Sequence, residues 1–210
     1  MADRATQSLL RSGVIVGPLY LAVGLAQAFT REGFDFARHP LSVLANGPGG
    51  WVQTANFVVS GLLVIAAAAG IRRALGSRAT SFFLSVFGAG MLVAAVFRAD
   101  PVDGFPPGTP EGFPTAISTA GMIHFIAGTL GFMALAISCF SAAAAFRRRG
   151  AKALAGFSLL SGLAVLLGFF GGAMLGPAGI TGIWFSVVMG WAWLAVVSLQ
   201  LYRASPEGAR

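Results

Sequence analysis

Six long apolar runs, separated by short polar segments, dominate the pattern of the chain. They cover about residues 12–30, 52–71, 79–97, 119–146, 152–174 and 181–202. A helix needs roughly 20 apolar residues to cross about 30 Å of hydrocarbon, and each run is close to that length or longer. Because every backbone polar group must be satisfied inside lipid, such runs fold as helices. The pattern predicts an all-α, polytopic membrane protein in which residues 1–210 form a single six-transmembrane-helix bundle.

The first run permits a second interpretation. It follows two arginines and ends in Ala26-Gln27-Ala28, which is similar to the small-x-small cleavage site of a signal peptide. The run is long for a signal core, however, and it contains Pro18. We therefore expect it to be a membrane span.

Composition supports lipid as the solvent of this chain. Only 10% of the residues are charged and 56% are hydrophobic, whereas about 25% are charged in a soluble domain. The formal net charge of +7 is compatible with nucleic acid as a partner. The basic residues lie in short clusters between apolar runs, however, as orientation in a membrane requires. We expect the lipid bilayer as a partner, and no nucleic acid.

Charge is distributed unevenly between the two sides of the predicted bundle. Most Lys and Arg residues lie at the termini and in the second and fourth connections. The opposite side carries the remaining basic residues and most of the acidic ones, namely Arg31, Arg38, Arg98, Glu32, Asp35, Asp100, Asp103 and Glu111. Since Lys and Arg are retained in the cytoplasm, we expect both termini to be cytoplasmic and the acidic side to face outward.

Polar residues of this outward side come from separate parts of the sequence and form the candidate site. The topology brings together Asp35, His39, Ser42, Asn46, Gln53, Asn56, Arg98, Asp100 and His124. Ionisable groups at membrane depth generally face the bundle interior or a wet cavity. Gln53 and Asn56 are three residues apart and share one side of a helix. These residues predict a polar pocket on the extracytoplasmic face.

The residue types suggest roles in such a pocket. Asp35, His39, Asp100 and His124 are candidate catalytic acids or bases, because apolar surroundings raise a carboxyl pKa towards neutrality and an imidazole ordinarily titrates near neutrality. Ligand-binding roles are expected for Arg98, as the partner of an anion or carboxylate, and for Ser42, Asn46, Gln53 and Asn56. The alternative is structural, with Arg98 paired to Asp35 or Asp100 and His124 hydrogen-bonded within the bundle.

Metal binding and a catalytic triad receive less support from the sequence. Asp35, His39, Asp100 and His124 permit a four-ligand shell, but zinc sites usually show tighter spacing, such as two histidines on one helical turn. Ser42, His124 and Asp100 match a Ser-His-Asp triad in composition, without a local signature. We assign no metal site, and the sequence leaves any cofactor unknown.

Two further segments bear on the pocket. Residues 98–115, "RADPVDGFPPGTPEGFPT", contain five prolines and three glycines and predict either an ordered cap or a mobile lid. A stripe of small residues in the fourth run, including Gly121, Gly128 and Gly131, predicts close approach to another helix. Several aromatic residues either line an apolar chamber or anchor the helix ends at the interface, namely Phe169, Phe170, Trp184, Trp191 and Trp193.

Three blocks of the sequence resemble one family. They are "FDFARHPLSVLANGPGGWVQTANFVVSGLL" at 34–63, "FRADPVDGFPPGTP" at 97–110 and "GMIH" at 121–124. The chain is similar over nearly its whole length to the bacterial membrane family called domain of unknown function 998, of the six-span actinobacterial type. The resemblance implies motif positions at His39, Pro40, Ser42, Gly47, Trp51, Gln53, Asn56, Asp100, Pro101 and His124. It adds Trp51 to the ligand-binding candidates and implies the bacterial cytoplasmic membrane, but no reaction. Phe125 stands where relatives often carry an acid, which weakens a His-carboxylate pair drawn from that helix alone.

Three functions stay open at this point. The first is a membrane-embedded enzyme that applies Asp and His acid-base chemistry to a lipid or isoprenoid-like substrate. The second is a non-catalytic protein that binds or carries a lipid or an apolar small molecule, and the third is a structural or assembly role. The sequence assigns neither a reaction nor an oligomeric state.

Overall fold

Six α-helices make up most of the structure. The computed structural model describes residues 4–112 and 114–204. The helices are α1 (Arg4–Thr30), α2 (Gly50–Leu75), α3 (Arg78–Val96), α4 (Thr119–Arg148), α5 (Lys152–Met174) and α6 (Ile180–Arg203), with short 3-10 helices η1 (Leu41–Ala45) and η2 (Gly176–Gly179). All six α-helices are long and apolar enough to cross a membrane. The all-α prediction is confirmed, and the chain is an integral membrane protein.

The helix ends are set by local backbone chemistry rather than by the limits of the apolar runs. Gly76 ends α2 with a φ of 70°, and its N–H donates to the Arg72 carbonyl over 2.9 Å. Glycine adopts this conformation without the steric cost of a Cβ. Ser77 and Ser118 begin α3 and α4, because each side chain accepts a hydrogen bond from a backbone N–H of the first turn. The helices therefore extend past several of the predicted boundaries.

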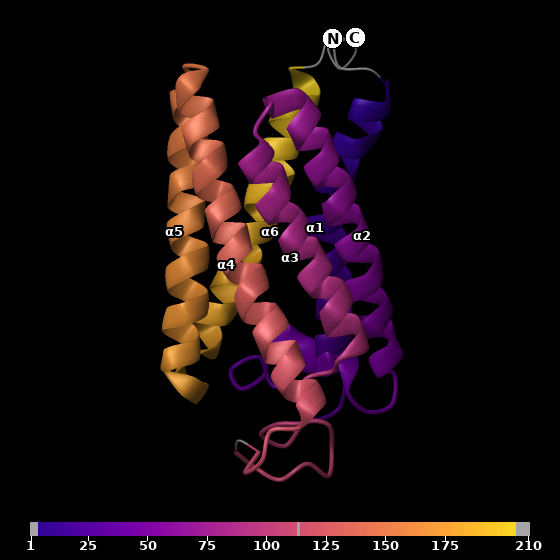
Figure 1. The fold of residues 1–210 in the computed structure, drawn as a ribbon. Coiled ribbons are helices and arrows are strands. Elements are labelled where there is room, and N and C mark those ends of the chain that lie inside the picture. The colour runs from indigo at the N-terminus through magenta and orange to yellow at the C-terminus, as the bar shows by residue number, and fades with distance from the viewer. Residues whose placement is uncertain (1–3, 113, 205–210) are drawn as a thin grey trace.

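The helices form a ring in chain order. Each packs against the next, and α6 returns to pack against α1 (Figure 1). The start of α1 and the end of α6 lie at the same end of the bundle, which we call the terminal end. Residues 31–49, 97–112, 114–118 and 175–179 lie at the opposite end, which we call the loop end. The side of the membrane that each end faces stays a prediction.

Glycines bring several helices into close contact. A Cβ added at Gly61 of α2 would lie 2.8 Å from the carbonyl oxygen of Gly88 in α3, and the reverse distance is the same. A Cβ at Gly17 of α1 would lie 3.0 Å from Trp191 of α6. Close packing of this kind stabilises helix pairs in lipid, where apolar side chains gain little from leaving the hydrocarbon.

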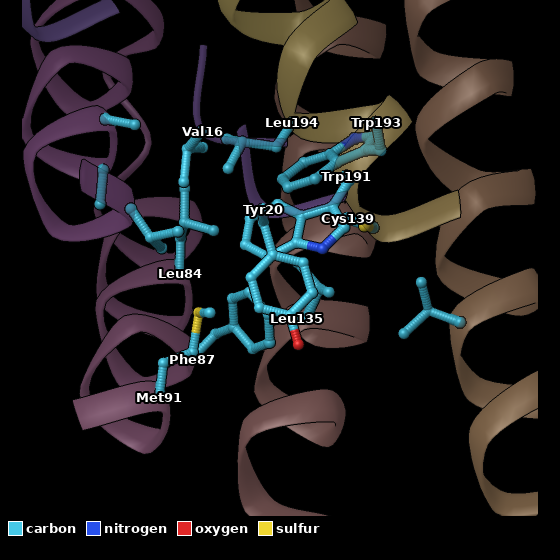
Figure 2. Packing of buried hydrophobic residues seen from close by; sticks show 14 of the residues in the cluster. Val16, Tyr20, Leu84, Phe87, Met91, Leu135, Cys139, Trp191, Trp193 and Leu194 are labelled. Atoms are coloured by element: carbon cyan, nitrogen blue, oxygen red, sulfur yellow. The ribbon is translucent and has the colours of Figure 1, made fainter. Parts of the chain in front are cut away.

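The centre of the ring is filled by aromatic and aliphatic side chains (Figure 2). The ring of Tyr20 lies 5.0 Å from that of Trp191, which in turn lies 5.7 Å from Phe87. Cys139 is fully buried in the same cluster. These rings close the middle of the bundle and form the floor of the space described next.

Candidate functional site

A cavity of about 370 Å³ lies between the aromatic floor and the loop end. All six α-helices contribute to its mostly apolar wall, which includes Tyr20, Phe57, Phe87, Phe169, Ile183 and Trp184. A smaller void shares Tyr20, Phe57 and Phe87 with it and extends to Trp191. The volume and the apolar wall are typical of a small-molecule site. Of the predicted aromatic lining, Phe169 and Trp184 line the cavity, and Trp191 borders the smaller void.

The cavity is accessible from the side of the bundle. The rings of Phe132 and Phe169 stack at 4.2 Å between α4 and α5, and the two helices separate towards the loop end (Figure 1). Phe125 lines the cavity and is 60% exposed at the surface. Along α4 the lining runs from Gly121 to Phe132, which spans about 16 Å at 1.5 Å per residue. The cavity therefore reaches the lipid-facing surface of the bundle beside Phe125.

The small-residue stripe of α4 faces this cavity. A Cβ added at Gly131 would lie 3.5 Å from Cδ2 of the Phe87 ring. Gly121 lies directly against the Asp100 carboxylate. The prediction of close helix contact is wrong at Gly128, because a Cβ there would meet no atom within 4 Å. The physical reason is the separation of α4 from α5, which turns the stripe into a cavity wall.

His124 lies in the second turn of α4 and lines the cavity. Its Nδ1 is 2.9 Å from the carbonyl oxygen of Phe97, at the end of α3. A carbonyl only accepts, so Nδ1 carries the proton and Nε2 of the neutral ring is an acceptor. The backbone carbonyl of Ala94 also lies near the ring, and within residues 4–112 and 114–204 Nε2 has no hydrogen bond of normal geometry. His124 therefore offers an acceptor atom at the polar margin of an apolar space.

Asp100 lines the cavity beside the start of α4. Its Oδ2 accepts the backbone N–H of Ser118 over 3.0 Å. An anion at this position also interacts favourably with the positive end of the α4 dipole. Asp100 is close enough for its charge to act on the imidazole of His124. The structure thus brings together two of the four predicted catalytic residues.

Arg38, which the sequence placed on the outward side without a role in the pocket, contacts two carboxylates at the loop end of the cavity. Arg38 donates from Nε and Nη2 to the two carboxylate oxygens of Asp103, at 2.9 and 2.6 Å, and its Nη2 also contacts Glu111. Bidentate pairs of this kind fix both partners in orientation. Asp103 accepts a further hydrogen bond from the Gly112 N–H over 2.8 Å. The Arg38 guanidinium holds the pKa of Asp103 well below its usual range, and the two carboxylates raise the pKa of Arg38.

The segment around Asp103 packs on the loop end, and we call residues 102–112 the cap. Val102 and Phe105 exchange backbone hydrogen bonds of 3.1 and 3.0 Å around a two-residue turn in which Asp103 and Gly104 have positive φ. Asp-Gly is a preferred dipeptide for such turns. Phe105 is fully buried, and its ring lies 5.5 Å from that of Phe34. The Asp103-Gly104 dipeptide was the signal in the sequence that could have located this turn.

Acid should open the cap only at low pH. The pKa of Asp103 is lower in the folded chain than its ordinary value of 3.8. The contribution of the ionised Asp103 to the stability of the cap is therefore fully present above pH about 4, and it is lost as the pH falls through the lowered pKa. We expect the hydrogen-exchange protection factors of residues 102–112 to be constant from pH about 7 to 5. Asp103→Asn should show reduced protection already at neutral pH. A loss of protection in the native chain between pH about 7 and 5 would contradict this assignment.

His39 is held at the centre of the loop contacts and does not line the cavity. It is 1% exposed, its Nδ1 accepts the Asp35 N–H over 2.9 Å, and its Nε2 donates to the Asp103 carbonyl over 3.0 Å. Its own carbonyl accepts from the indole N–H of Trp184 over 3.1 Å. Both ring nitrogens are therefore engaged, which leaves neither for the predicted acid-base role. Asp35 is exposed, lies outside the cavity lining and accepts the Ala37 N–H in a turn.

Gln53 and Asn56 lie between α1 and α2 and do not line the cavity. The Gln53 Oε1 accepts from Gln27 over 3.0 Å and from Asn56 over 3.2 Å. Asn56 also donates to the backbone carbonyl of Tyr20 over 3.1 Å. Gln53 is fully buried, so its hydrogen-bonding groups are directed to protein partners. The shared helix side was predicted correctly, but it faces a helix rather than a ligand.

Gln53→Ala should lower stability and leave the cavity unchanged. The substitution removes an acceptor from two buried amide groups, and an unsatisfied buried polar group costs about 1–3 kcal/mol. We expect a lower midpoint of thermal unfolding in detergent, with unchanged affinity for any ligand of the cavity. If the variant lost affinity for the ligand but kept its stability, Gln53 would instead be a ligand-binding residue.

The remaining predicted ligand-binding residues lie in different surroundings. Ser42 lines the cavity, whereas Asn46, Trp51 and Arg98 do not. Asn46 donates to the Ala99 carbonyl over 2.9 Å, and Trp51 is 69% exposed near the loop end of α2. Arg98 is exposed, and the expected pairing of Arg98 with Asp35 or Asp100 is wrong. The ion pairs in the described part of the chain join Arg38 to Asp103 and to Glu111.

Acidic, histidine and cysteine side chains do not gather into a metal site in the described ranges. No three of them lie close enough together to hold an ion. His39 and Asp35 belong to the cap contacts, whereas Asp100 and His124 belong to the cavity. The four residues that the sequence permitted as ligands of one metal ion therefore lie in two separate places.

Comparison with known proteins gives one match. A family model described as "Protein of unknown function (DUF998)" matches residues 14–200. No curated protein and no solved structure matches the chain. The matched range includes every residue that lines the cavity.

Proposed function

We propose, for a chain that belongs to the DUF998 family of proteins of unknown function, that this integral membrane protein binds a lipid or another apolar small molecule in its cavity. The observation that carries the proposal is the cavity of about 370 Å³ with an apolar wall and a polar loop end. Its opening between α4 and α5 would lie at the depth of lipid tails. An amphiphile would place its chain along α4 and its head beside Asp100 and His124.

The polar contacts would determine which molecule binds. Apolar chains already lie in hydrocarbon within a bilayer, so moving one into an apolar cavity yields little hydrophobic free energy. Hydrogen bonds to the head are stronger in the low-dielectric interior than in water. His124 and Ser42 lie where such contacts would form. We therefore expect selective binding of amphiphiles rather than general uptake of hydrocarbon.

A long-chain alcohol with a nitroxide on its chain tests the proposal. Trp184 lines the cavity, and Trp51 is exposed on the outside of the bundle. In a Trp51→Phe chain, we expect the nitroxide to quench tryptophan fluorescence saturably, with one ligand per chain, and the unlabelled alcohol to reverse the quenching. Quenching that rises linearly without saturation would show partition into the detergent alone and would contradict the proposal.

We also propose that the loop end faces out of the bacterial cytoplasmic membrane, as the distribution of basic residues suggests. A cysteine in place of Thr109 tests this orientation, because the native Cys139 is buried. We expect the new thiol to react with a membrane-impermeant reagent in intact cells. Reaction only after the cells are lysed would place the cap in the cytoplasm.

Acid-base catalysis is a second candidate, favoured by the acceptor Nε2 of His124 beside Asp100. An acceptor imidazole in an apolar site can remove a proton from a bound substrate. If the protein is an enzyme, incubation with a total lipid extract should yield products that mass spectrometry detects with the native chain and not with His124→Gln. Unaltered lipids in both samples, together with saturable alcohol binding, would favour binding without reaction.

A further inference from the structure

The charge balance at the loop end of the cavity restricts the head of the ligand. Arg38 is the cationic side chain of the lining, and Asp100 and Asp103 are its anionic ones. The side-chain charges therefore sum to −1 when the imidazole of His124 is neutral. Glu111, which contacts Arg38 from outside the lining, adds a further negative charge. An anionic head would enter a region that already carries excess negative charge.

The charge of Arg38 is already compensated by two carboxylates of the protein. The Nε and Nη2 of Arg38 donate to Asp103, and Nη2 also contacts Glu111. The two N–H groups of Nη1 remain, but an anion at Nη1 would lie beside the carboxylates of Asp103 and Glu111, which already compensate the charge of Arg38. An anion that displaced Asp103 from Arg38 would also disturb the loop end, because Asp103 holds the cap through the Gly112 N–H.

Apart from Nη1 of Arg38 and the hydroxyl of Ser42, the polar side-chain atoms of the lining without a hydrogen-bond partner among the described residues are acceptors. Oδ2 of Asp100 accepts the Ser118 N–H, whereas Oδ1 forms no hydrogen bond among the described residues. His124 donates through Nδ1, which leaves Nε2 to accept. The Ser42 hydroxyl can donate or accept. A head that donates hydrogen bonds would satisfy these atoms, and a positive charge would in addition interact with Asp100.

Aromatic rings complete the surroundings of the head. Phe57 lies 6.2 Å from the His124 ring, and Phe125 follows His124 in the chain; both line the cavity. The faces of aromatic rings attract cations within about 6 Å. From these contacts, and on the basis of the function proposed above, we infer that the cavity selects amphiphiles with a cationic, hydrogen-bond-donating head, such as a long-chain primary amine, over those with an anionic head.

Competition against the nitroxide-labelled alcohol tests the inference with three probes of equal chain length, dodecylamine, dodecanol and dodecyl phosphate. We expect the amine to displace the label at a concentration about tenfold below that of the alcohol, which corresponds to about 1.4 kcal/mol. The phosphate should compete less well than the alcohol. All titrations use the full chain in one uncharged detergent, so that each probe partitions equally for every variant.

Asp100→Asn separates the charge of the head contact from its shape. Asparagine keeps an oxygen for the Ser118 N–H but removes the negative charge, so the advantage of the amine over the alcohol should fall to less than about threefold. Glu32→Gln is the matched control, because Glu32 is exposed at the loop end and does not line the cavity. This variant should keep the advantage of the amine.

The outcomes distinguish the inference from the function on which it rests. If the amine competed no better than the alcohol, or if the phosphate competed better than the alcohol, the inference about the head would be overturned. Saturable binding of the labelled alcohol would still support the proposed function. An amine advantage that falls equally in Asp100→Asn and Glu32→Gln would show general surface attraction and would also overturn the inference. If the labelled alcohol shows no saturable binding, the proposed function itself fails.

Discussion

Gly128→Leu should abolish ligand binding without unfolding the protein. Gly128 lines the cavity, and a Cβ added there would meet no atom within 4 Å. The isobutyl group would therefore occupy the space between α4 and α5 that a ligand chain needs. We expect the affinity for the labelled alcohol to fall at least about tenfold, a loss of about 1.4 kcal/mol or more. Because glycine destabilises a helix interior by roughly 0.5–1 kcal/mol relative to alanine, the unfolding midpoint should be unchanged or higher.

Gly156→Leu is the control for this substitution. Gly156 also lies within a helix and has no atom within 4 Å of a would-be Cβ, but it is exposed and does not line the cavity. It should leave alcohol binding unchanged. If Gly128→Leu binds the alcohol as tightly as Gly156→Leu does, the ligand does not occupy the space along α4.

His39→Ala should release the cap from the loop end. The imidazole connects the Asp35 N–H to the Asp103 carbonyl and is buried beside Phe105, with ring centroids 5.5 Å apart. Removing it leaves two polar groups without their partner, at a cost of about 2–6 kcal/mol in the stability of the cap. We expect hydrogen-exchange protection of residues 102–112 to fall by a factor of about 30 or more, since 1.4 kcal/mol corresponds to tenfold. Protection in the helices should change little.

His124→Gln provides the contrast between the two histidines. His124 contacts the end of α3 through Phe97 and does not hydrogen-bond the segment 102–112. Protection of the cap should therefore persist in this variant, whereas ligand affinity should fall. Equal loss of protection in His39→Ala and His124→Gln would contradict the separate roles that we assign to them.

The helices were predictable because hydrocarbon demands a minimum length and an apolar composition. The ends of the helices depended on finer signals, such as Gly76 at the end of α2 and Ser118 at the start of α4. The stripe of α4 shows a limit of this reasoning. Small residues on one helix face permit a close neighbour, but whether the neighbour is there depends on the path of α5, which periodicity does not contain.

The site was predictable only in part, for a related reason. Asp100 and His124 lie in the cavity as expected, since the topology places the ends of α3 and α4 together. Spacing shows that Gln53 and Asn56 share a helix side but not that α1 supplies Gln27 opposite them. The sequence suggested that Arg98 pairs with Asp35 or Asp100, whereas Arg38 forms the ion pair, with Asp103, which lies 65 residues away on a turn.

Native mass spectrometry of the full chain, extracted from its own membranes in mild detergent, tests most directly whether the cavity holds a ligand. We expect the native chain and Gly156→Leu to carry one apolar small molecule per chain, and Gly128→Leu to carry none. Lipid analysis of the released molecule would then identify its head. The account would be contradicted if the native chain carried no bound molecule. It would also be contradicted if Gly128→Leu retained the bound molecule to the same extent as the native chain.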